Sequence, residues 1–331
     1  MNIKNIDINN ESPIFIGGSK RGGTTLLRKI ISAHSKITIP PPGWFYHFIF
    51  PYLHTYGDLN KDKNILELIE DFLQIPLVCK YWNLKKNSSE ILSLLPERSF
   101  RGVLYKFFNL YGKRFNTPLW GSKSPSNVFW FKDIYRDFPK AKFILLYRDG
   151  RDVSVDLVET YWGPSNLFSA CLLWKSYTCA MIESKKYLKQ NSFYEVYYED
   201  LVENPQNTIK GICKFLNIKY ESSMLKYYER NSDNFMKKEY HQKASKPITA
   251  KYVGIYKKLS LNDQQLQIKV VGDILKKLKY KIDVSPRKID FWEREHYLEE
   301  DRHGGLILEG GVEYRINFVK KQLKRKKEGL Y

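Results

Sequence analysis

The feature that most limits the fold of this chain is a glycine-rich turn between an apolar run and a helical pattern. Residues 13–17 form a short apolar run that leads directly into the turn, in the segment PIFIGGSKRGGTT. Leucine and isoleucine then recur at helical spacing, at positions 26, 27, 30 and 31. The run is typical of a buried parallel strand, and the spacing after it is typical of an amphipathic helix. The sequence therefore predicts a strand, a tight turn and a helix that begins near Thr24.

The turn has the form of a phosphate-binding loop without its lysine. Nucleotide-hydrolysing loops have the pattern G-x-x-x-x-G-K-[ST]. Gly17 and Gly22 have this spacing and Thr24 follows, but Gly23 stands at the lysine position. Backbone N–H groups at the start of a helix still form a cradle for an anion, and basic or hydroxyl side chains can add to it. The candidate anion-binding residues are Lys20, Arg21, Gly22, Gly23, Thr24 and Thr25.

Two further apolar segments predict strands of the same sheet. They are residues 141–147 and 193–201, and helical patterns follow both. Strands that alternate with helices predict an α/β fold, with a central parallel sheet flanked by helices on both faces in a three-layer arrangement like that of P-loop nucleotide hydrolases. Ligands of such sheets bind beyond the carboxyl ends of the strands, where Arg21 and Arg148 both fall.

The rest of the chain divides into a helical insert and a charged end. Residues 58–138 predict several helices with aromatic-rich connections, interrupted by the tight segment LWGSKSPSN. We therefore expect one domain over residues 1–285, with a helical insert at about 43–120, and a charged helical extension over 286–331. We expect the last part, VKKQLKRKKEGLY, to be a solvent-exposed basic face, and we assign no chemistry to it.

The net charge favours an anionic partner. Fifty-five lysines and arginines against 36 aspartates and glutamates leave +19, which suits nucleotides, acidic glycans, nucleic acid and anionic membranes alike. No signature of a nucleic-acid-binding fold accompanies this charge, so we expect no specific nucleic-acid partner. The N-terminus lacks a signal-peptide pattern, no apolar run is long enough to cross a bilayer, and the four cysteines form no metal-type pair. A reducing, cytoplasmic setting is therefore expected.

The end of the second predicted strand argues against a bound metal ion. A magnesium-dependent phosphate site needs an aspartate at the end of a neighbouring strand. Here Arg148 follows Tyr147 directly and precedes Asp149. Cationic character at this place suits a transfer reaction in which lysine and arginine hold the anion, and we expect no metal.

Four motifs in order give the chain a resemblance to sulfotransferases that use 3′-phosphoadenosine 5′-phosphosulfate (PAPS). RGGTTLL at 21–27 resembles the family's 5′-phosphosulfate loop, and RDGRDVSVD at 148–156 resembles its 3′-phosphate segment. YEDL at 198–201, followed by Asn-Pro at 204–205, also fits the family. GSKSP at 121–125 is similar to the G-x-K-T-P element of bacterial and tyrosylprotein-type members. The resemblance extends from residue 13 to about residue 218.

The resemblance implies a role for each matching residue. Arg21 and the backbone of the loop would hold the 5′-phosphosulfate, and Arg21 would also offset the charge that builds on the bridging oxygen as the sulfuryl group leaves. Lys123 would share this catalytic role. Arg148 would bind the 3′-phosphate, and Tyr198 would lie near the adenine or the 3′-phosphate. The implied activity is metal-independent transfer of a sulfuryl group from PAPS to a hydroxyl or amine acceptor.

Two positions depart from the family's pattern. The family has a serine eight residues after the 3′-phosphate arginine, and Asp156 stands there. Either Ser154 replaces that serine, or Asp156 turns away, or recognition of the 3′-phosphate is weakened. The catalytic glutamate of tyrosylprotein-type members is also missing, because Pro41 and Pro42 occupy the matching positions. We therefore predict His47 as the general base, since histidine titrates near neutrality.

Two other classes of function stay open from the residues alone. A nucleotide kinase or hydrolase with an aberrant loop would turn over ATP with Mg²⁺, which Gly23 at the lysine position disfavours. A non-catalytic basic protein would bind a polyanion through basic and aromatic residues on an open face. Asp156 also allows a donor-binding protein without activity. The sequence leaves the acceptor open (a glycan, a lipid or another small molecule), and the oligomeric state as well.

Overall fold

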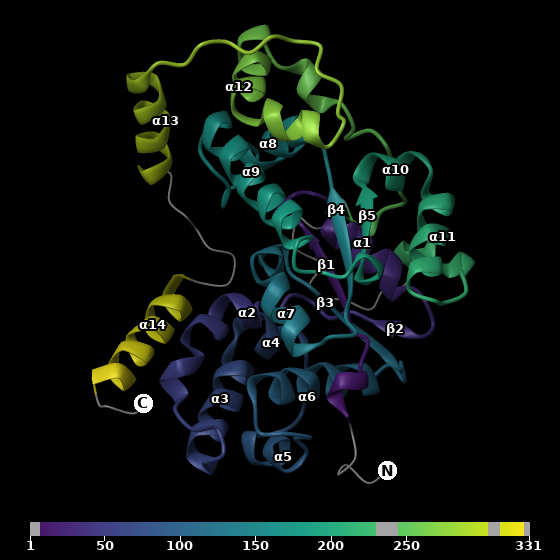
Figure 1. The fold of residues 1–331 in the computed structure, drawn as a ribbon, viewed down its shortest axis with the longest axis vertical. Helices are drawn as coiled ribbons and strands as arrows, with labels where there is room; N and C mark the ends of the chain where they lie inside the picture. The colour runs from purple at the N-terminus through teal and green to yellow at the C-terminus, as the bar shows by residue number, and fades with distance from the viewer. Residues whose placement is uncertain (1–6, 230–243, 304–311, 328–331) are drawn as a thin grey trace.

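The computed structural model describes residues 7–229, 244–303 and 312–327. In these residues a parallel sheet of five strands, in the order β2-β3-β1-β4-β5, forms the centre of the molecule (Figure 1). The strands are β1 Ile14–Gly18, β2 Ile37–Thr38, β3 Leu119–Lys123, β4 Lys142–Tyr147 and β5 Phe193–Tyr197. Since β1 pairs with β3 on one side and with β4 on the other, the glycine-rich loop leaves the middle of the sheet.

Alternate residues of the central strands face opposite sides of the sheet, because successive side chains of a strand point in opposite directions. Ile14 and Ile16 of β1 belong to one hydrophobic core, and Phe15 belongs to the other. β4 repeats the pattern, with Ile144 in the first core and Phe143 in the second. Both faces of the sheet are therefore buried, as the continuous apolar runs predict.

Helices cover both faces of the sheet. On the Ile14 side lie α1 (Thr24–Ser32), α10 (Tyr198–Glu203) and α11 (Pro205–Phe215). On the Phe15 side lie α7 (Phe131–Asp137), α8 (Gly150–Val158), α9 (Leu167–Ser184) and α12 (Leu261–Lys277). Figure 1 shows α8, α9 and α12 grouped together, with α10 and α11 beyond the β5 edge of the sheet. The predicted α/β fold with helices on both faces is confirmed.

A group of helices separates β2 from β3 and forms the lower part of the molecule in Figure 1. It consists of α2 (Phe45–Phe48), η3 (Phe50–Tyr56), α3 (Asp62–Gln74), α4 (Pro76–Tyr81), α5 (Ser88–Ser93) and α6 (Phe100–Lys113), where η denotes a 3-10 helix. Aromatic rings fill its centre: Phe45 stacks on Phe72 with ring centroids 4.5 Å apart and meets Trp82 edge-on at 5.4 Å. This core is continuous with the core on the Phe15 side of the sheet.

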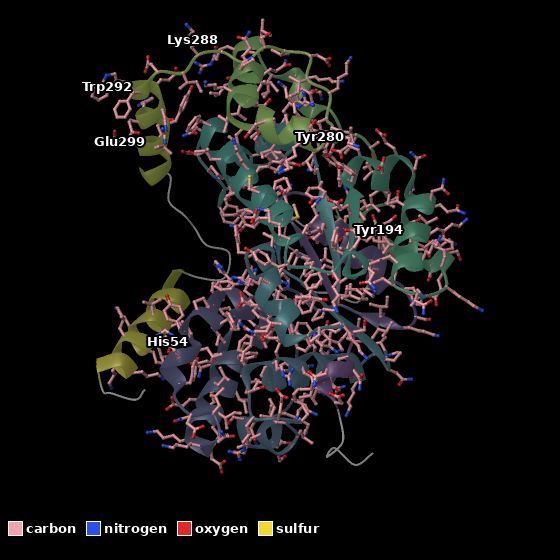
Figure 2. The ribbon with its side chains drawn as sticks, in the orientation of Figure 1. His54, Tyr194, Tyr280, Lys288, Trp292 and Glu299 are labelled. Atoms are coloured by element: carbon pink, nitrogen blue, oxygen red, sulfur yellow. The ribbon has the colours of Figure 1, made fainter. Side chains whose placement is uncertain are left out.

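The last two helices pack on different parts of the molecule. Tyr297 of α13 (Phe291–His303) stacks on Phe168 of α9 at 5.4 Å, whereas Trp292 of α13 is 77% exposed and lies at the outer edge of the molecule (Figure 2). α14 (Val312–Lys327) lies beside the helical insert, and Phe318 of α14 meets Tyr52 of η3 edge-on at 5.6 Å (Figure 1).

The basic end of the chain is not wholly a solvent-exposed face, so that prediction is wrong for Arg325 of α14. Arg325 is only 5% exposed. Its Nη1 lies 3.3 Å from Oδ2 of Asp71 in α3, and Lys321 Nζ lies 2.6 Å from Oδ1 of the same carboxylate. A buried carboxylate in the insert therefore contacts two basic side chains of the C-terminal helix.

Two secondary-structure predictions differ from the structure. The segment LWGSKSPSN contains a strand of the central sheet, β3, and the predicted strand at 193–201 ends at Tyr197, where α10 follows. The remaining 3-10 helices are η2 Ile8–Asn10, η4 Pro125–Trp130, η5 Gln190–Ser192, η6 Ser222–Met224, η7 Tyr227–Glu229 and η10 Ile255–Lys258.

All four cysteines are free thiols. Within the described ranges, every helix is too short or too polar to cross a membrane.

Candidate active site

A cavity lies at the carboxyl ends of four adjacent strands, β3, β1, β4 and β5. Each strand contributes to its lining at or just after its last residue: Lys123 from β3, Lys20 and Arg21 from the loop after β1, Arg148 after β4 and Tyr198 after β5. Because the strands are parallel and in register, segments far apart in the sequence end at the same edge of the sheet. The cavity therefore lies where the sequence predicted a ligand.

The loop after β1 has a backbone that glycine makes possible. Gly22 donates its N–H to the carbonyl of Ser19 at 3.0 Å and so closes the turn. Gly23 has a φ of +90°, and a Cβ at this position would lie 2.5 Å from Cδ2 of Tyr198. Glycine is therefore needed at position 23 both for the left-handed backbone and for the contact with the tyrosine ring. This contact explains locally why a lysine does not stand there.

The helix that follows the loop presents its N-terminus to the cavity. α1 begins at Thr24 without a side-chain cap, and both Thr24 and Thr25 line the cavity. The first N–H groups of a helix lack partners within the helix and carry the positive end of its dipole. Lys123 Nζ lies 3.2 Å from Thr25 Oγ1, and Lys123 is only 3% exposed. A full positive charge thus adds to the helix dipole at one place in the cavity.

Arg148 is held in a network that joins three segments of the chain. Its Nη1 donates to Asp156 Oδ2 at 2.6 Å and to the carbonyl of Arg21 at 2.8 Å, and its Nη2 donates to the carbonyl of Tyr252 at 2.9 Å. Its guanidinium carbon lies 4.5 Å from the centroid of the Tyr198 ring. Burial acts to lower the pKa of Arg148, but Asp156, Tyr198 and Asp152 together outweigh burial, so that the pKa is raised. Arg148 is therefore charged and fixed.

Asp156 lines the cavity and pairs with a second arginine. Its Oδ1 lies 3.3 Å from Nη2 of Arg21, and the residue is 3% exposed. Ser154 points elsewhere: its Oγ donates to the carbonyl of Arg151 and accepts a bond from Nε2 of Gln267, both at 2.9 Å. Asp156 therefore does not turn away from the predicted donor site. Ser154 is not brought to it, which corrects its prediction as a donor-binding residue.

The arrangement matches a known family of enzymes. A family model described as the sulfotransferase family matches residues 13–222, which is more than half of the chain. The chain belongs to the sulfotransferase family. The family and the enzyme class expected from the four motifs are therefore confirmed, and the alternatives of a kinase and of a non-catalytic polyanion-binding protein lose their support.

Individual relatives agree with this placement of the sulfotransferase. Protein-tyrosine sulfotransferase A of Caenorhabditis elegans is 25% identical over 250 residues, which cover 69% of this chain and 59% of that protein. The Drosophila melanogaster protein-tyrosine sulfotransferase is 24% identical over 227 residues, which cover 67% of this chain and 41% of that protein. The chain thus spans about half the length of these relatives. The sulfotransferase domain of the Synechococcus PCC 7002 olefin synthase has a similar fold, with a TM-score of 0.57, 19% identity and coverage of 82% of this chain and 97% of that domain.

His47 of this sulfotransferase does not line the cavity that Arg21 and Lys123, the other two predicted catalytic residues, line. It is half-buried and lines a separate cavity together with Phe48, Trp130 and Phe318. Trp44, which lines the first cavity, meets Phe48 edge-on at 5.4 Å, so this aromatic pair is a wall between the two cavities. A general base must lie within hydrogen-bond reach of the proton that it removes. The structure therefore corrects the prediction that His47 is the base.

Sequence reasoning missed several residues of the cavity. Lys20 was predicted, but its partner was not: Lys20 Nζ lies 5.3 Å from the ring centroid of Trp162, and both residues line the cavity. Residues 247–249 and Tyr252 form a further wall. Lys246 and Pro247 resemble a cofactor-binding loop late in the sequences of this family only loosely. No other local pattern marks these positions. Among the described residues, no group of three or more His, Cys, Asp or Glu could hold a metal ion.

Proposed function

We propose that this sulfotransferase moves the sulfuryl group of PAPS to a hydroxyl or amine acceptor. The observation that carries the proposal is the convergence of Arg21, Lys123 and Arg148 on one cavity at the N-terminus of α1. A donor with a phosphosulfate at one end and a phosphate at the other needs positive groups at both ends. The α1 side and the Arg148 side of the cavity offer such groups, and membership of the family supports the chemistry of sulfuryl transfer.

The proposed roles divide the donor between the two sides of the cavity. The loop backbone, Thr24 and Thr25 hold the 5′-phosphosulfate, with Lys20 beside them. Lys123 and Arg21 face the bridging oxygen, where negative charge grows as the sulfur–oxygen bond breaks, so they stabilise the transition state more than the ground state. Arg148 receives the 3′ end of the nucleotide. These cations supply the positive charge for which other phosphate enzymes use a metal ion, and we propose that no metal takes part.

The acceptor approaches from the side of the helical insert in this proposal. Pro42 and Trp44 precede α2, and Pro125 begins η4; all three line the cavity. Apolar rings of this kind stack on sugar or aromatic rings and leave the reacting hydroxyl free. We propose that residues 1–285 form the sulfotransferase domain and that residues 286–331 are an extension of it. A glycan, a lipid or another small molecule as acceptor, and a cytoplasmic location, stay predictions.

We expect adenosine 3′,5′-bisphosphate, the spent donor, to stabilise the protein in the absence of Mg²⁺. Binding to the native state alone stabilises it by RT ln(1 + [L]/Kd), which is about 2.7 kcal/mol at a concentration of one hundred times Kd. For a chain of this size such a gain corresponds to a rise of several degrees in Tm, on the order of 2–4 °C per kcal/mol. Differential scanning fluorimetry over a concentration series measures the rise.

ATP with Mg²⁺ is the matched comparison for this experiment. The lysine-free loop predicts that ATP raises Tm much less than the bisphosphate does. Equal shifts with ATP and Mg²⁺, together with no shift from the bisphosphate, would contradict the donor assignment and favour a nucleotide hydrolase. An Arg148→Ala variant should lose most of the bisphosphate effect, because a guanidinium bonds phosphate oxygens with two of its N–H groups at once.

A further inference from the structure

The carboxylate of Asp156 lies between Arg148, the arginine proposed for the 3′ end of the donor, and Arg21, the arginine proposed for its bridging oxygen. It lies 2.6 Å from Nη1 of Arg148 and 3.3 Å from Nη2 of Arg21, and it is almost completely buried. Together, the two guanidinium groups and the carboxylate carry a net charge of +1, whereas the two guanidinium groups alone would carry +2. These three side chains therefore attract a phosphate less strongly than two arginines alone would.

The hydrogen bonds of Arg148 point to the same conclusion. A guanidinium has five N–H donors. Nη1 of Arg148 is engaged by Asp156 and by the carbonyl of Arg21, and Nη2 donates to the carbonyl of Tyr252. Nε of Arg148 is buried and has no hydrogen-bond partner in the described part of the chain. A 3′-phosphate would thus find one edge of the guanidinium already taken by a carboxylate that repels it.

The neighbouring serine does not relieve this repulsion. Ser154 is fully buried and does not line the cavity, and its hydroxyl is bonded to the carbonyl of Arg151 and to Nε2 of Gln267. A carboxylate also has a positive use at such a place, because it accepts hydrogen bonds from the hydroxyls of a ribose. Dinucleotide-binding enzymes use the same chemistry: an acidic residue selects a free ribose hydroxyl, and an arginine selects a ribose phosphate.

We propose that Asp156 lets this enzyme accept adenosine 5′-phosphosulfate (APS), whose ribose 3′ position is a free hydroxyl, as a sulfuryl donor besides PAPS. The inference rests on the proposed function and adds a second donor to it. In the reaction the bond between sulfur and the bridging oxygen breaks, and a bond forms between sulfur and the acceptor oxygen. The acceptor hydroxyl releases its proton, and 5′-AMP leaves in place of adenosine 3′,5′-bisphosphate. A reaction that makes APS from ATP and sulfate would suffice to supply this donor.

Isothermal titration calorimetry with APS and with PAPS tests the proposal on the full chain. We expect the wild-type protein to bind the two donors with Kd values within about tenfold of each other. The reason is that Arg148 attracts the 3′-phosphate of PAPS while Asp156 repels it, so that this phosphate adds little to the binding free energy. Asp156→Ser should lower the Kd for PAPS about tenfold, because the charge that repels the 3′-phosphate is removed. The Kd for APS should stay unchanged or rise, because a hydrogen-bond acceptor for the ribose hydroxyl is lost. Asp156→Asn, which keeps the size of the side chain, gives the same test if the serine variant does not fold.

Glu159→Ser is the matched control, because Glu159 is an exposed carboxylate one turn further along the same segment and does not line the cavity. It should leave both Kd values unchanged. The inference is overturned if the wild-type protein binds PAPS a hundredfold or more tighter than APS and neither Asp156 variant changes that ratio; the proposed function survives this result. The proposed function itself fails if neither donor binds, or if donor binding does not depend on Arg148.

Discussion

A Lys123→Met variant should retain its fold and most of its donor affinity but lose about 10²–10³ in kcat, the loss typical when one group that stabilises developing negative charge is removed. Lys123 lies at the end of β3, with Nζ 3.2 Å from Thr25 Oγ1 at the N-terminus of α1. In the proposed reaction its charge acts on the bridging oxygen, and this oxygen becomes more negative only as the sulfuryl group leaves. Removing such an interaction lowers kcat and kcat/KM together and changes the ground state little.

Lys106→Met is a matched control, because the chain contains a second buried lysine outside the cavity. Lys106 of α6 is 2% exposed, and burial, with a contribution from Lys113, lowers the pKa of Lys106 to about 8. Its replacement should leave kcat near the wild-type value. This control separates the effect of losing any buried lysine from the effect of losing Lys123. The measurement is steady-state transfer of radiolabelled sulfate from PAPS to an acceptor found in a panel of glycans, lipids and phenols. A Lys123→Met enzyme with unchanged kcat and a raised KM would assign the lysine to binding only.

The convergence of Arg21 and Arg148 on one cavity could be predicted because local patterns fix it. Apolar runs mark β1 and β4, and parallel strands must end at one edge of the sheet. Whatever follows those runs, here Arg21 and Arg148, must therefore converge. β3 escaped prediction for the opposite reason: Gly121, Ser122 and Lys123 are poor strand formers, and the segment is a strand because β1 and β2 pair with it on either side.

The position of His47 depends on packing that no local pattern shows. Trp44, just before α2, has a φ of +50°, a left-handed backbone that is rare for a bulky residue. The turn that it makes directs Trp44 to the cavity lined by Arg21 and Lys123 and leaves His47 beside Phe48, at the second cavity. Proximity in sequence to a predicted site is thus poor evidence for a base. The basic C-terminal run misled for a similar reason, because its partner Asp71 is 250 positions away from Lys321 in the sequence.

We expect Asp71→Ala to lower the free energy of unfolding by about 3–5 kcal/mol, the range found when one member of a buried ion pair is removed. Asp71 is 2% exposed, and it accepts hydrogen bonds from the Tyr56 hydroxyl at 2.5 Å and from Lys321 at 2.6 Å. Arg325 lies 3.3 Å away and is itself buried. Burial, together with Asp71, raises the pKa of the Tyr56 phenol, so the tyrosine stays protonated and needs an acceptor. The alanine variant leaves both the phenol and the guanidinium without this carboxylate.

Urea unfolding of Asp71→Ala, Arg325→Ala and the double variant identifies which partner is responsible. If the ion pair between Asp71 and Arg325 holds the C-terminal helix, Asp71→Ala should lower the free energy of unfolding much less in the Arg325→Ala background than in the wild type. The reason is that the effects of substitutions within one network are not additive. Asp273→Ala is the control: Asp273 is 62% exposed and pairs with Lys175 at 2.8 Å on the surface, and such exposed pairs contribute about 0–1 kcal/mol. Additive losses from Asp71 and Arg325 would show that α14 docks through Phe318 and its apolar contacts instead. A loss for Asp71→Ala no larger than that for Asp273→Ala would mean that the buried network contributes nothing to stability.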